Sequence, residues 1–331
     1  MSARRNSVIG LAVVAAAAAS AYAAEKAVMR RVRSGADPDA ADEFAIPEGV
    51  RHSLPSHDGG TINTIEIGDG PTIVLSHGVT LSMRTWVKQL EFLPKRGFRT
   101  VAFDHRGHGD SSVGAAGHAI ENLAEDVRSV VEGLDLRDAV LVGHSMGGVA
   151  VQAFMVMFPE IAAERVAGIV LLSTIARTPM SGHERLGQFI AAAADRGPDP
   201  GGLMARKDIG YLLARVGFGR EAQPAHIELT RRMILDCPVE TRREATRALM
   251  ELDLVDRLDR ITVPTLVISG TADLVTPPAE SRRIHARIPH SRLESVEGGG
   301  HMLMFERTAL IDDLISDFAR QVQGASASVD V

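Results

Sequence analysis

The segment around Ser145 constrains the fold of this chain more than any other segment. An apolar run at Ala139–Val142 leads into Gly-His-Ser-Met-Gly at 143–147, and a helical pattern follows at Val149–Phe158. A buried strand that turns sharply into a helix exposes one side chain at the end of a sheet, and flanking glycines remove the Cβ atoms that would clash there. Because Gly-x-Ser-x-Gly arises by chance roughly 0.2 times in such a chain, this setting, more than the motif, predicts a nucleophile at Ser145.

A serine hydroxyl is a weak nucleophile at neutral pH, so Ser145 requires a histidine base and an acid that orients the base. Asp273 follows the apolar run Thr265–Ile268, and such a position faces the crevice in which open α/β sheets carry out their chemistry. His301 follows a strand-like run at Arg292–Val296 and three glycines, which allow the imidazole to turn back over the sheet. The chain order Ser145, Asp273, His301 is that of the α/β-hydrolase arrangement and differs from the orders in chymotrypsin and subtilisin.

Four blocks of residues, taken in order, resemble the α/β-hydrolase superfamily from about Val50 to about Gln321. They are Ser-His-Gly-Val at 76–79, Asp-His-Arg-Gly-His-Gly-Asp-Ser at 104–111, the segment at 143–147, and the loops of Asp273 and His301. The resemblance implies that the backbone N–H groups of Val79 and Met146 form an oxyanion hole, worth about 3 kcal/mol for each donor. It also implies a helical lid over the nucleophile, which we place at about residues 174–261.

Each candidate residue also has a purely structural interpretation, which the sequence leaves open. Ser145 fits a tight turn, Asp273 fits the cap of a helix that begins near Pro277, and His301 fits the start of a helix. We expect three neighbours to support these candidates: His77, Gly78 and His144. The two histidines are expected to act through hydrogen bonds.

Asp104, His105, Arg106 and His108 crowd one short loop, which raises the question of a metal site. Their spacing matches no helical histidine pair, and no cysteine stands nearby. We therefore predict a structural loop that is held by a contact between an aspartate and the arginine. We expect neither a metal ion nor an organic cofactor.

The alternation of short apolar runs and helical patterns predicts an α/β fold with a mostly parallel, doubly wound sheet of about eight strands. Two antiparallel strands are expected at 50–54 and 61–67, followed by parallel strands at 72–76, 100–103, 139–142, 168–172, 265–268 and 292–296. A helix is expected at Ile120–Leu134, where apolar residues recur at helical spacing.

Between Ser173 and Ile261 this alternation breaks. Helical stretches without a convincing strand are expected there, at 184–194, 202–216, 224–235 and 240–258. Their apolar side chains favour the core of the lid over the lining of an acyl pocket, because a Leu or Met stripe at helical spacing is usually packing. The residues concerned include Phe189, Leu203, Met204, Leu212, Leu213 and Phe218.

The N-terminal segment at 1–33 combines the nearly continuous apolar stretch Val8–Ala24 with basic residues on both sides. As a signal peptide it has a basic start and small residues at Ala21 and Ala23, and its removal would leave an exported enzyme. As an uncleaved anchor, which we favour slightly, it has basic residues just beyond it that hold the following chain on the cytoplasmic side. A buried or frayed alanine-rich helix is the third interpretation. We therefore expect membrane contact through this segment, or export after cleavage.

Composition sets the remaining limits. With a formal charge of −6 in 331 residues, the sequence has no excess of basic residues, so nucleic acid is not an expected partner. Cys237 is the single cysteine, which excludes an intrachain disulfide. We place a polar linker at 34–49, the hydrolase domain at 50–322 and a flexible tail at 323–331.

Serine at the turn also bears on the reaction. Haloalkane dehalogenases and many epoxide hydrolases of the superfamily place Asp there, because they form an alkyl-enzyme ester, so Ser145 implies acyl transfer instead. We predict a hydrolase of carboxylic esters with an apolar acyl or alcohol part, acting on a small-molecule ester or a lipid. The alternatives are a cofactor-free haloperoxidase or perhydrolase, a carbon-carbon bond hydrolase, and a non-catalytic ligand-binding module on the same fold.

Overall fold

The computed structural model describes residues 26–27, 29–30, 33–34, 37–178 and 201–326 of the chain. The chain divides into two compact units, one made of 1–42 with 223–226 and the other of 43–222 with 227–331. Within the smaller unit, the N–H of Ala225 donates to Asp37 Oδ2 at 3.0 Å, and His226 Nε2 lies 2.8 Å from Asp39 Oδ2. Part of the expected linker at 34–49 therefore makes side-chain hydrogen bonds.

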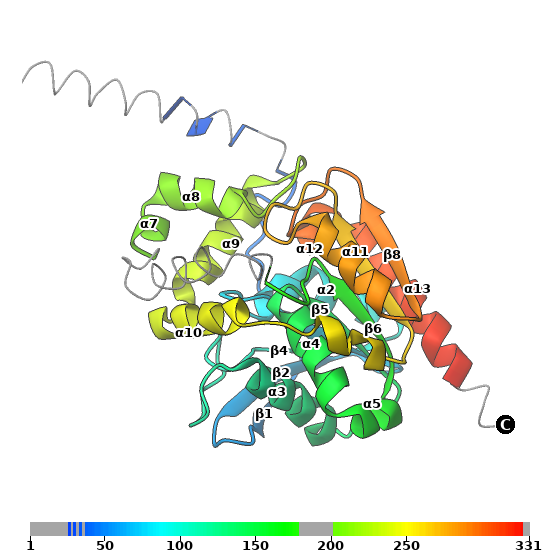
Figure 1. The fold of residues 1–331 in the computed structure, drawn as a ribbon. Helices are drawn as coiled ribbons and strands as arrows, with labels where there is room; N and C mark the ends of the chain where they lie inside the picture. The colour runs from blue at the N-terminus through cyan, green and yellow to red at the C-terminus, as the bar shows by residue number, and fades with distance from the viewer. Residues whose placement is uncertain (1–25, 28, 31–32, 35–36, 179–200, 327–331) are drawn as a thin grey trace, which may run out of the picture. The chain divides into compact units, whose positions relative to one another are not determined.

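A single eight-stranded sheet forms the centre of the larger unit (Figure 1). Its strands are β1 (Val50–Pro55), β2 (Thr61–Ile67), β3 (Thr72–Ser76), β4 (Arg99–Phe103), β5 (Ala139–His144), β6 (Val166–Leu172), β7 (Thr265–Gly270) and β8 (Ser291–Val296). They lie in the order β1-β2-β4-β3-β5-β6-β7-β8. The pairs β1–β2 and β2–β4 are antiparallel, and all the others are parallel. The predicted α/β fold is confirmed.

The register aligns the carboxyl ends of the central strands. Ser76 of β3 is opposite Gly143 of β5, and His144 of β5 is opposite Leu172 of β6. The loops that follow these strands therefore leave the sheet at one common edge, where open parallel sheets carry their sites.

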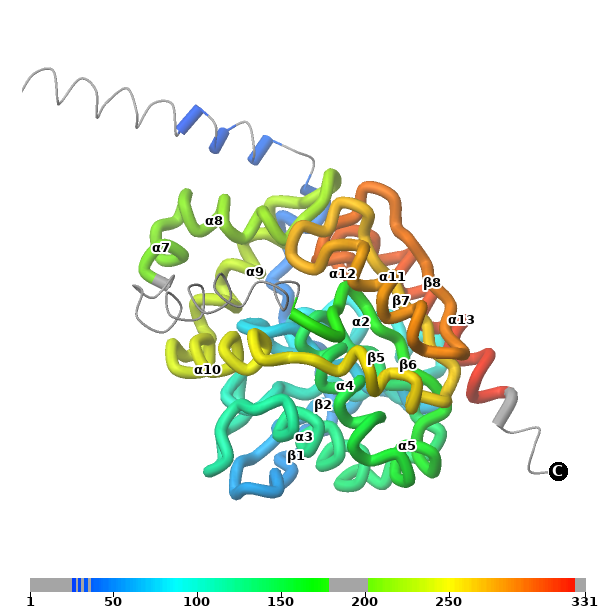
Figure 2. The backbone as a smooth tube through the Cα atoms, viewed as in Figure 1, coloured from blue at the N-terminus to red at the C-terminus, as the bar shows by residue number. Residues whose placement is uncertain are grey.

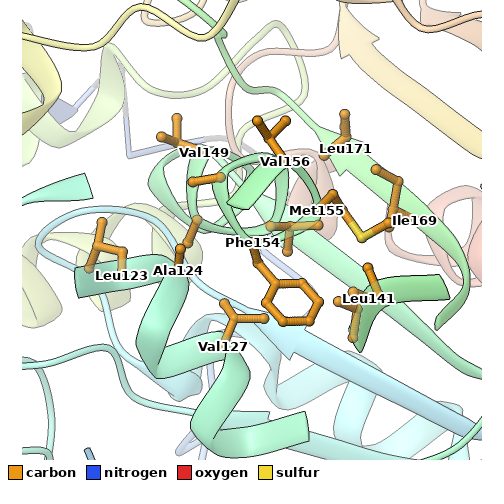
Figure 3. Packing of buried hydrophobic residues seen from close by; sticks show 14 of the residues in the cluster. Leu123, Ala124, Val127, Leu141, Val149, Phe154, Met155, Val156, Ile169 and Leu171 are labelled. Carbon is orange, nitrogen blue, oxygen red and sulfur yellow. The ribbon is translucent and has the colours of Figure 1, made fainter. Parts of the chain in front are cut away.

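One face of the sheet packs against helices α3 (Ile120–Gly133), α4 (Met146–Met157) and α11 (Pro278–Arg287). The predicted helix at 120–134 is confirmed as α3, which buries Leu123 and Val127 at helical spacing. Figure 3 shows Phe154 of α4 between Val127 and Leu141 of β5. Each fully buried side chain of this kind contributes about 1.5–3 kcal/mol relative to an exposed one.

Helix α13 (Thr308–Ser326) contacts β6 as well as helix α2 (Val87–Phe92). It continues past residue 323, where we expected the flexible tail to begin. Gln323 is buried, and its Nε2 donates to the carbonyl oxygens of Thr72 at 3.0 Å and Asp138 at 2.9 Å. Because these bonds satisfy two backbone acceptors, they hold the last turns of the helix against the sheet.

Between β6 and β7 the described chain contains the helices α7 (Gly201–Ala205), α8 (Lys207–Arg215), α9 (Pro224–Asp236) and α10 (Val239–Met250), which Figure 2 traces in green to yellow. The helix expected at 184–194, with Phe189, lies outside the described residues. The stretch expected at 202–216 is divided at Arg206, which has an extended backbone. The stretch expected at 240–258 ends at Met250, and a 3-10 turn follows at Val255–Arg260, where Asp253 Oδ1 accepts from the N–H of Val255.

The apolar residues of this insertion divide into two groups. Phe218 is buried, with 3% of its surface exposed, as expected of a core residue. Leu203, Leu212 and Leu213 are 47%, 37% and 40% exposed, so the expectation that they form a packed core is wrong. Leu203 lies on α7, and Leu212 and Leu213 lie on the short helix α8, so no element among the described residues fully covers them.

Within the described ranges, no single helix is both long enough and apolar enough to cross a membrane. Helices α4 and α5 (Pro159–Arg165) pass such a test only as a pair that is bent by 106°, and residues 146–156 of α4 are buried. The expected anchor or signal stretch Val8–Ala24 lies outside the described residues.

Candidate active site

Ser145 stands at a strained turn between β5 and α4, with φ 53° and ψ −119°. A non-glycine residue in such a conformation costs about 1–3 kcal/mol and persists only where its surroundings hold it. A Cβ on Gly143 would lie 2.5 Å from Gly147 O, and one on Gly147 would lie 2.3 Å from Ser76 O. The turn can therefore form only with glycine on both sides, as the motif predicted.

Hydrogen bonds to the end of β6 hold the Ser145 backbone in place. Its N–H donates to Leu172 O at 3.1 Å, and its carbonyl accepts from the Thr174 hydroxyl at 2.6 Å. The residue is 8% exposed. Its hydroxyl makes no hydrogen bond to any residue that the structure describes.

Asp273 and His301 form a buried pair, in which Asp273 Oδ2 lies 3.0 Å from His301 Nδ1. Asp273 Oδ1 accepts from the N–H groups of Val275 and Thr276, both at 2.8 Å, and Oδ2 accepts from the Thr276 hydroxyl at 2.7 Å. Asp273 thus caps a turn and holds the imidazole at once. Burial alone would raise the pKa of Asp273, but His301 and the Thr276 donors outweigh it and lower the pKa below its usual value.

His144, the residue before Ser145, contacts His301. The His144 ring lies 4.6 Å from the His301 ring between centroids, and its Nε2 lies 3.0 Å from His301 O. Since a carbonyl only accepts, His144 carries its proton on Nε2. Burial holds the pKa of His144 well below its usual value, so the ring is neutral. Among the described residues no hydrogen bond joins Ser145 to His301, so this last contact of the predicted triad remains a prediction.

The oxyanion donors remain predictions as well, but their surroundings are defined. A Cβ on Gly78 would lie 3.1 Å from Ser145 Cβ, so the backbone that leads to Val79 lies against the nucleophile. Met146 is the first residue of α4, and the N–H groups of a first helical turn have no partner within the helix. His77 Nδ1 lies 2.7 Å from Gly78 O, which agrees with its expected role as a supporting neighbour.

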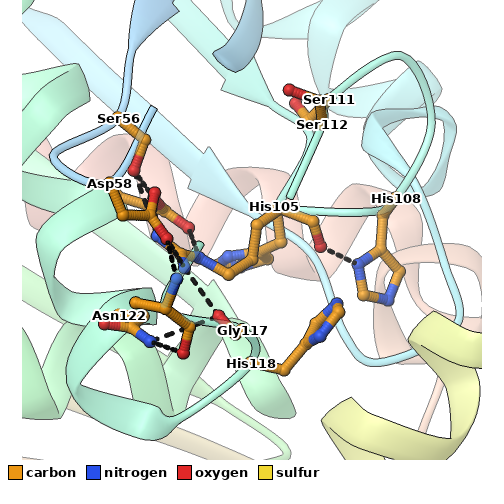
Figure 4. Close-up of polar contacts among 12 residues, drawn as sticks. Ser56, Asp58, His105, His108, Ser111, Ser112, Gly117, His118 and Asn122 are labelled. Carbon is orange, nitrogen blue, oxygen red and sulfur yellow. Dashed lines mark hydrogen bonds and ion pairs between the residues drawn. The ribbon is translucent and has the colours of Figure 1, made fainter. Parts of the chain in front are cut away.

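The loop at 104–108 is held by an aspartate–arginine contact, but the acids come from outside the loop. Arg106 donates to both oxygens of Asp126, at 2.6 and 2.8 Å, and to Asp58 at 3.0 Å. Figure 4 shows Ser56 and Asp58 on one side of the loop and His108 on the other. The sequence analysis missed Asp58 and Asp126, because neither has a local signal and they stand 48 and 20 residues from the arginine.

Asp104 serves a different purpose from the one expected of the loop acid. Its Oδ1 accepts from the N–H of Met83 at 2.7 Å, and its Oδ2 accepts from the N–H of Asp110 at 3.1 Å. Burial raises its pKa to about 6, although both amide donors oppose that shift. Among the described residues no three His, Cys, Asp or Glu side chains are grouped as metal ligands.

A cavity of about 280 Å³ lies beside the loop that follows β3. Its lining includes Leu81, Met83, Asp104, Met233 and Cys237, and no member of the predicted triad. Burial raises the pKa of the Cys237 thiol to about 12, so this side chain is a neutral thiol and not a nucleophile. The cavity therefore borders the loop of the predicted oxyanion donor Val79 but not the predicted triad.

Comparison with known proteins agrees with this geometry. Residues 73–313 match the model of the alpha/beta hydrolase family. A non-heme chloroperoxidase from Streptomyces lividans is 32% identical over 267 residues, which cover 75% of this chain and 91% of the relative. The structure of a thermophilic esterase from Thermogutta terrifontis is 28% identical with a TM-score of 0.70, covering 83% of this chain and 99% of that one. An esterase from Exiguobacterium antarcticum has the same fold, with a TM-score of 0.72, 22% identity, and coverage of 82% and 100%. This chain belongs to the α/β-hydrolase family.

Proposed function

We propose that this protein is a serine hydrolase that cleaves carboxylic esters with an apolar acyl or alcohol part through an acyl-enzyme intermediate. The observation that carries the proposal is the strained Ser145 at the β5–α4 turn, next to a buried histidine–aspartate pair. Holding a serine in this conformation lowers the stability of the fold, which indicates a functional reason for the strain.

In the proposed reaction, Ser145 Oγ attacks the ester carbonyl while His301 Nε2 takes the hydroxyl proton. Asp273 accepts a hydrogen bond from the Nδ1–H of His301 and stabilises the imidazolium that forms. The N–H groups of Val79 and Met146 stabilise the oxyanion of the tetrahedral intermediate. His301 then gives its proton to the leaving alcohol, and water attacks the acyl-enzyme in the second half of the reaction.

The test uses the full chain and p-nitrophenyl esters of graded acyl length. Replacing Ser145→Ala should lower kcat/KM by about 10⁴-fold or more, because the nucleophile and its base act as a unit. Ser281→Ala is the matched control, since Ser281 is a fully buried serine on α11 and does not belong to the predicted triad. Equal release of nitrophenol by wild type and Ser145→Ala would refute the proposal.

A second candidate is a cofactor-free haloperoxidase or perhydrolase, and the relative named a non-heme chloroperoxidase favours it. In that reaction the acyl-enzyme forms from a carboxylic acid with loss of water, and hydrogen peroxide takes the acyl group to give a peracid. Peracid then oxidises bromide to hypobromite and returns the carboxylic acid. Acetate- and peroxide-dependent bromination that is lost in Ser145→Ala, together with slow ester hydrolysis, would favour this candidate over the esterase.

A further inference from the structure

Two loops at the carboxyl edge of the sheet are joined by hydrogen bonds: the oxyanion loop at 77–83 and the loop at 104–111. Each loop donates backbone N–H groups to side chains of the other. The bonds run from His105 N to His77 Nε2 at 3.0 Å, from Thr80 N to His108 Nε2 at 3.1 Å, and from Met83 N to Asp104 Oδ1 at 2.7 Å.

Thr80, next to the predicted oxyanion donor Val79, has a left-handed backbone with φ 63°. This conformation is unfavourable for a β-branched residue, so neighbouring groups must hold it. The N–H of Thr80 donates to His108 Nε2, and the N–H of the next residue, Leu81, donates to Gly78 O at 3.2 Å. These two bonds define the turn that carries Val79.

The contacts of His108 fix which of its nitrogens accepts. His108 Nδ1 lies 3.0 Å from Arg106 O, and because a carbonyl only accepts, Nδ1 carries the proton. Nε2 is then free to accept from Thr80. The ring is fully buried, and burial lowers its pKa to about 4, so it stays neutral at pH 7. Arg106 is itself held by Asp126, which gives the acceptor a rigid support.

Two successive peptide planes of the oxyanion loop are therefore fixed by imidazoles. The plane that contains Val79 N–H also contains Gly78 O, which accepts from His77 Nδ1 at 2.7 Å. In a trans peptide the C=O and N–H point in opposite directions, so this bond sets the direction of the Val79 N–H. The following plane contains Thr80 N–H and is fixed by His108.

We propose that His108 is a positioning residue: by holding the Val79–Thr80 peptide, it fixes the turn in which the adjoining Gly78–Val79 peptide directs the Val79 N–H at the oxyanion. The proposal rests on the proposed function, since it assigns a role within the same site. His108 touches neither Ser145 nor His301 through any contact in the described chain. Its effect therefore acts on stabilisation of the tetrahedral intermediate and not on proton transfer.

The variant His108→Phe keeps an aromatic side chain and removes both ring nitrogens, including the Nε2 acceptor, whereas His108→Gln places an amide oxygen near the position of Nε2. We expect His108→Phe to lower kcat on p-nitrophenyl butyrate about 10-fold or more with KM within about twofold, because a misplaced donor affects the transition state more than the bound ester. His108→Gln should recover most of this loss.

The control is His118→Phe. His118 is also buried near this loop, but its Nδ1 bonds to Glu244 at 2.8 Å. It should lower the melting temperature as His108→Phe does and leave kcat within about twofold of wild type. A normal kcat in folded His108→Phe, an equal loss in His118→Phe, or no rescue by His108→Gln would each overturn the proposal.

Amide hydrogen exchange over residues 76–84 gives a readout that does not require ester hydrolysis. Exchange should be faster in His108→Phe than in wild type, and unchanged in His118→Phe, because only the first variant frees the Thr80 N–H. If wild type fails to hydrolyse esters, the proposed function fails, and the exchange rates still decide whether His108 holds the loop. Unchanged exchange in His108→Phe would refute the positioning role.

Discussion

At the scale of single residues, two buried carboxyl groups have pKa values shifted in opposite directions. Asp273 is buried, but donors from His301 and Thr276 surround it, and its pKa lies below the usual value. Asp312 of α13 is also buried, and its donor is the Gln89 amide at 2.7 Å. Burial raises the pKa of Asp312 to about 6, although Gln89 opposes the shift. The number of donors, and not burial alone, decides which acid stays ionised.

This contrast predicts a pH-dependent cost at Asp312. Its pKa is raised in the folded state, so folding binds a proton between about pH 4 and pH 6, and stability falls as the pH rises through that range. Asp312→Asn keeps an acceptor for Gln89 and removes the charge. We expect the variant to be more stable than wild type at pH 8, by about 1–3 kcal/mol, and equally stable at pH 4.

Urea unfolding at both pH values measures this difference. The control is Asp317→Asn on the same helix, whose side chain is largely exposed and should change stability little. A stability difference between Asp312→Asn and wild type that does not change with pH would contradict the assigned protonation.

Single residues also show where sequence reasoning ends. The positions of Ser145, Asp273 and His301 after the strands β5, β7 and β8 were predictable, because parallel strands end at one edge of the sheet. The partners of Arg106 were not predictable, because tertiary pairing leaves no spacing to recognise. Thr80 was missed for another reason: a left-handed threonine breaks the local preference of its residue type, and only the fold shows it.

At the scale of elements, the insertion between β6 and β7 is hydrogen-bonded to the loop of the predicted base, His301. Gly217 O, just after α8, accepts from the N–H of His301 at 2.9 Å and from that of Met302 at 3.1 Å. A Cβ on Gly219 would lie 2.2 Å from Gly298 O and 2.5 Å from Gly300 N. The segment that follows α8 therefore packs backbone against backbone on the His301 loop.

Gly219→Ala tests the importance of this packing. The added methyl group meets backbone atoms that cannot move alone, so we expect a loss of about 1–3 kcal/mol in unfolding free energy. We also expect a lower kcat on p-nitrophenyl esters, because the His301 loop must shift. Gly202→Ala on α7 is the matched control, since nothing lies within 4 Å of its added Cβ, and alanine favours the helix. Equal behaviour of the two variants would contradict this account.

The predicted elements also differ in how well they followed from the sequence. Strands β3 to β7 are mainly apolar runs, whereas β8 is not. All six strands were predicted from the sequence. The insertion was harder, because helix ends there depend on single residues such as Arg206 and Asp253. Exposure of Leu203, Leu212 and Leu213 was unpredictable from spacing, since the helical pattern is the same whether or not a partner element covers it.

At the scale of the whole molecule, the N-terminal stretch Val8–Ala24 leads to a prediction about location. We propose that it attaches the enzyme to a membrane, because a nearly continuous apolar stretch is flanked by basic residues on both sides. The full chain should sediment with membranes in a bacterial host and resist extraction by high salt. A variant lacking residues 2–25 should remain in the supernatant.

N-terminal sequencing of the mature chain separates an anchor from a signal peptide. An intact first residue on the membrane-bound protein would support the anchor. A new terminus near Ala24 would instead indicate export after cleavage.

The order of strands in the sheet is the whole-molecule property that the sequence could not supply. Strand β4 pairs with β2 and β3, so the chain crosses over before it returns to the centre of the sheet. Contacts between side chains of distant strands determine the strand order, and a single sequence does not show those contacts.

The carbonyl of Gly217 has a consequence for how this family member can diversify. Any change that moves the segment after α8 also displaces the oxygen that accepts from the backbone N–H of His301. The position of this segment and the alignment of the predicted base are thus linked. New specificities should therefore arise more readily from substitutions elsewhere in the insertion than from remodelling this junction.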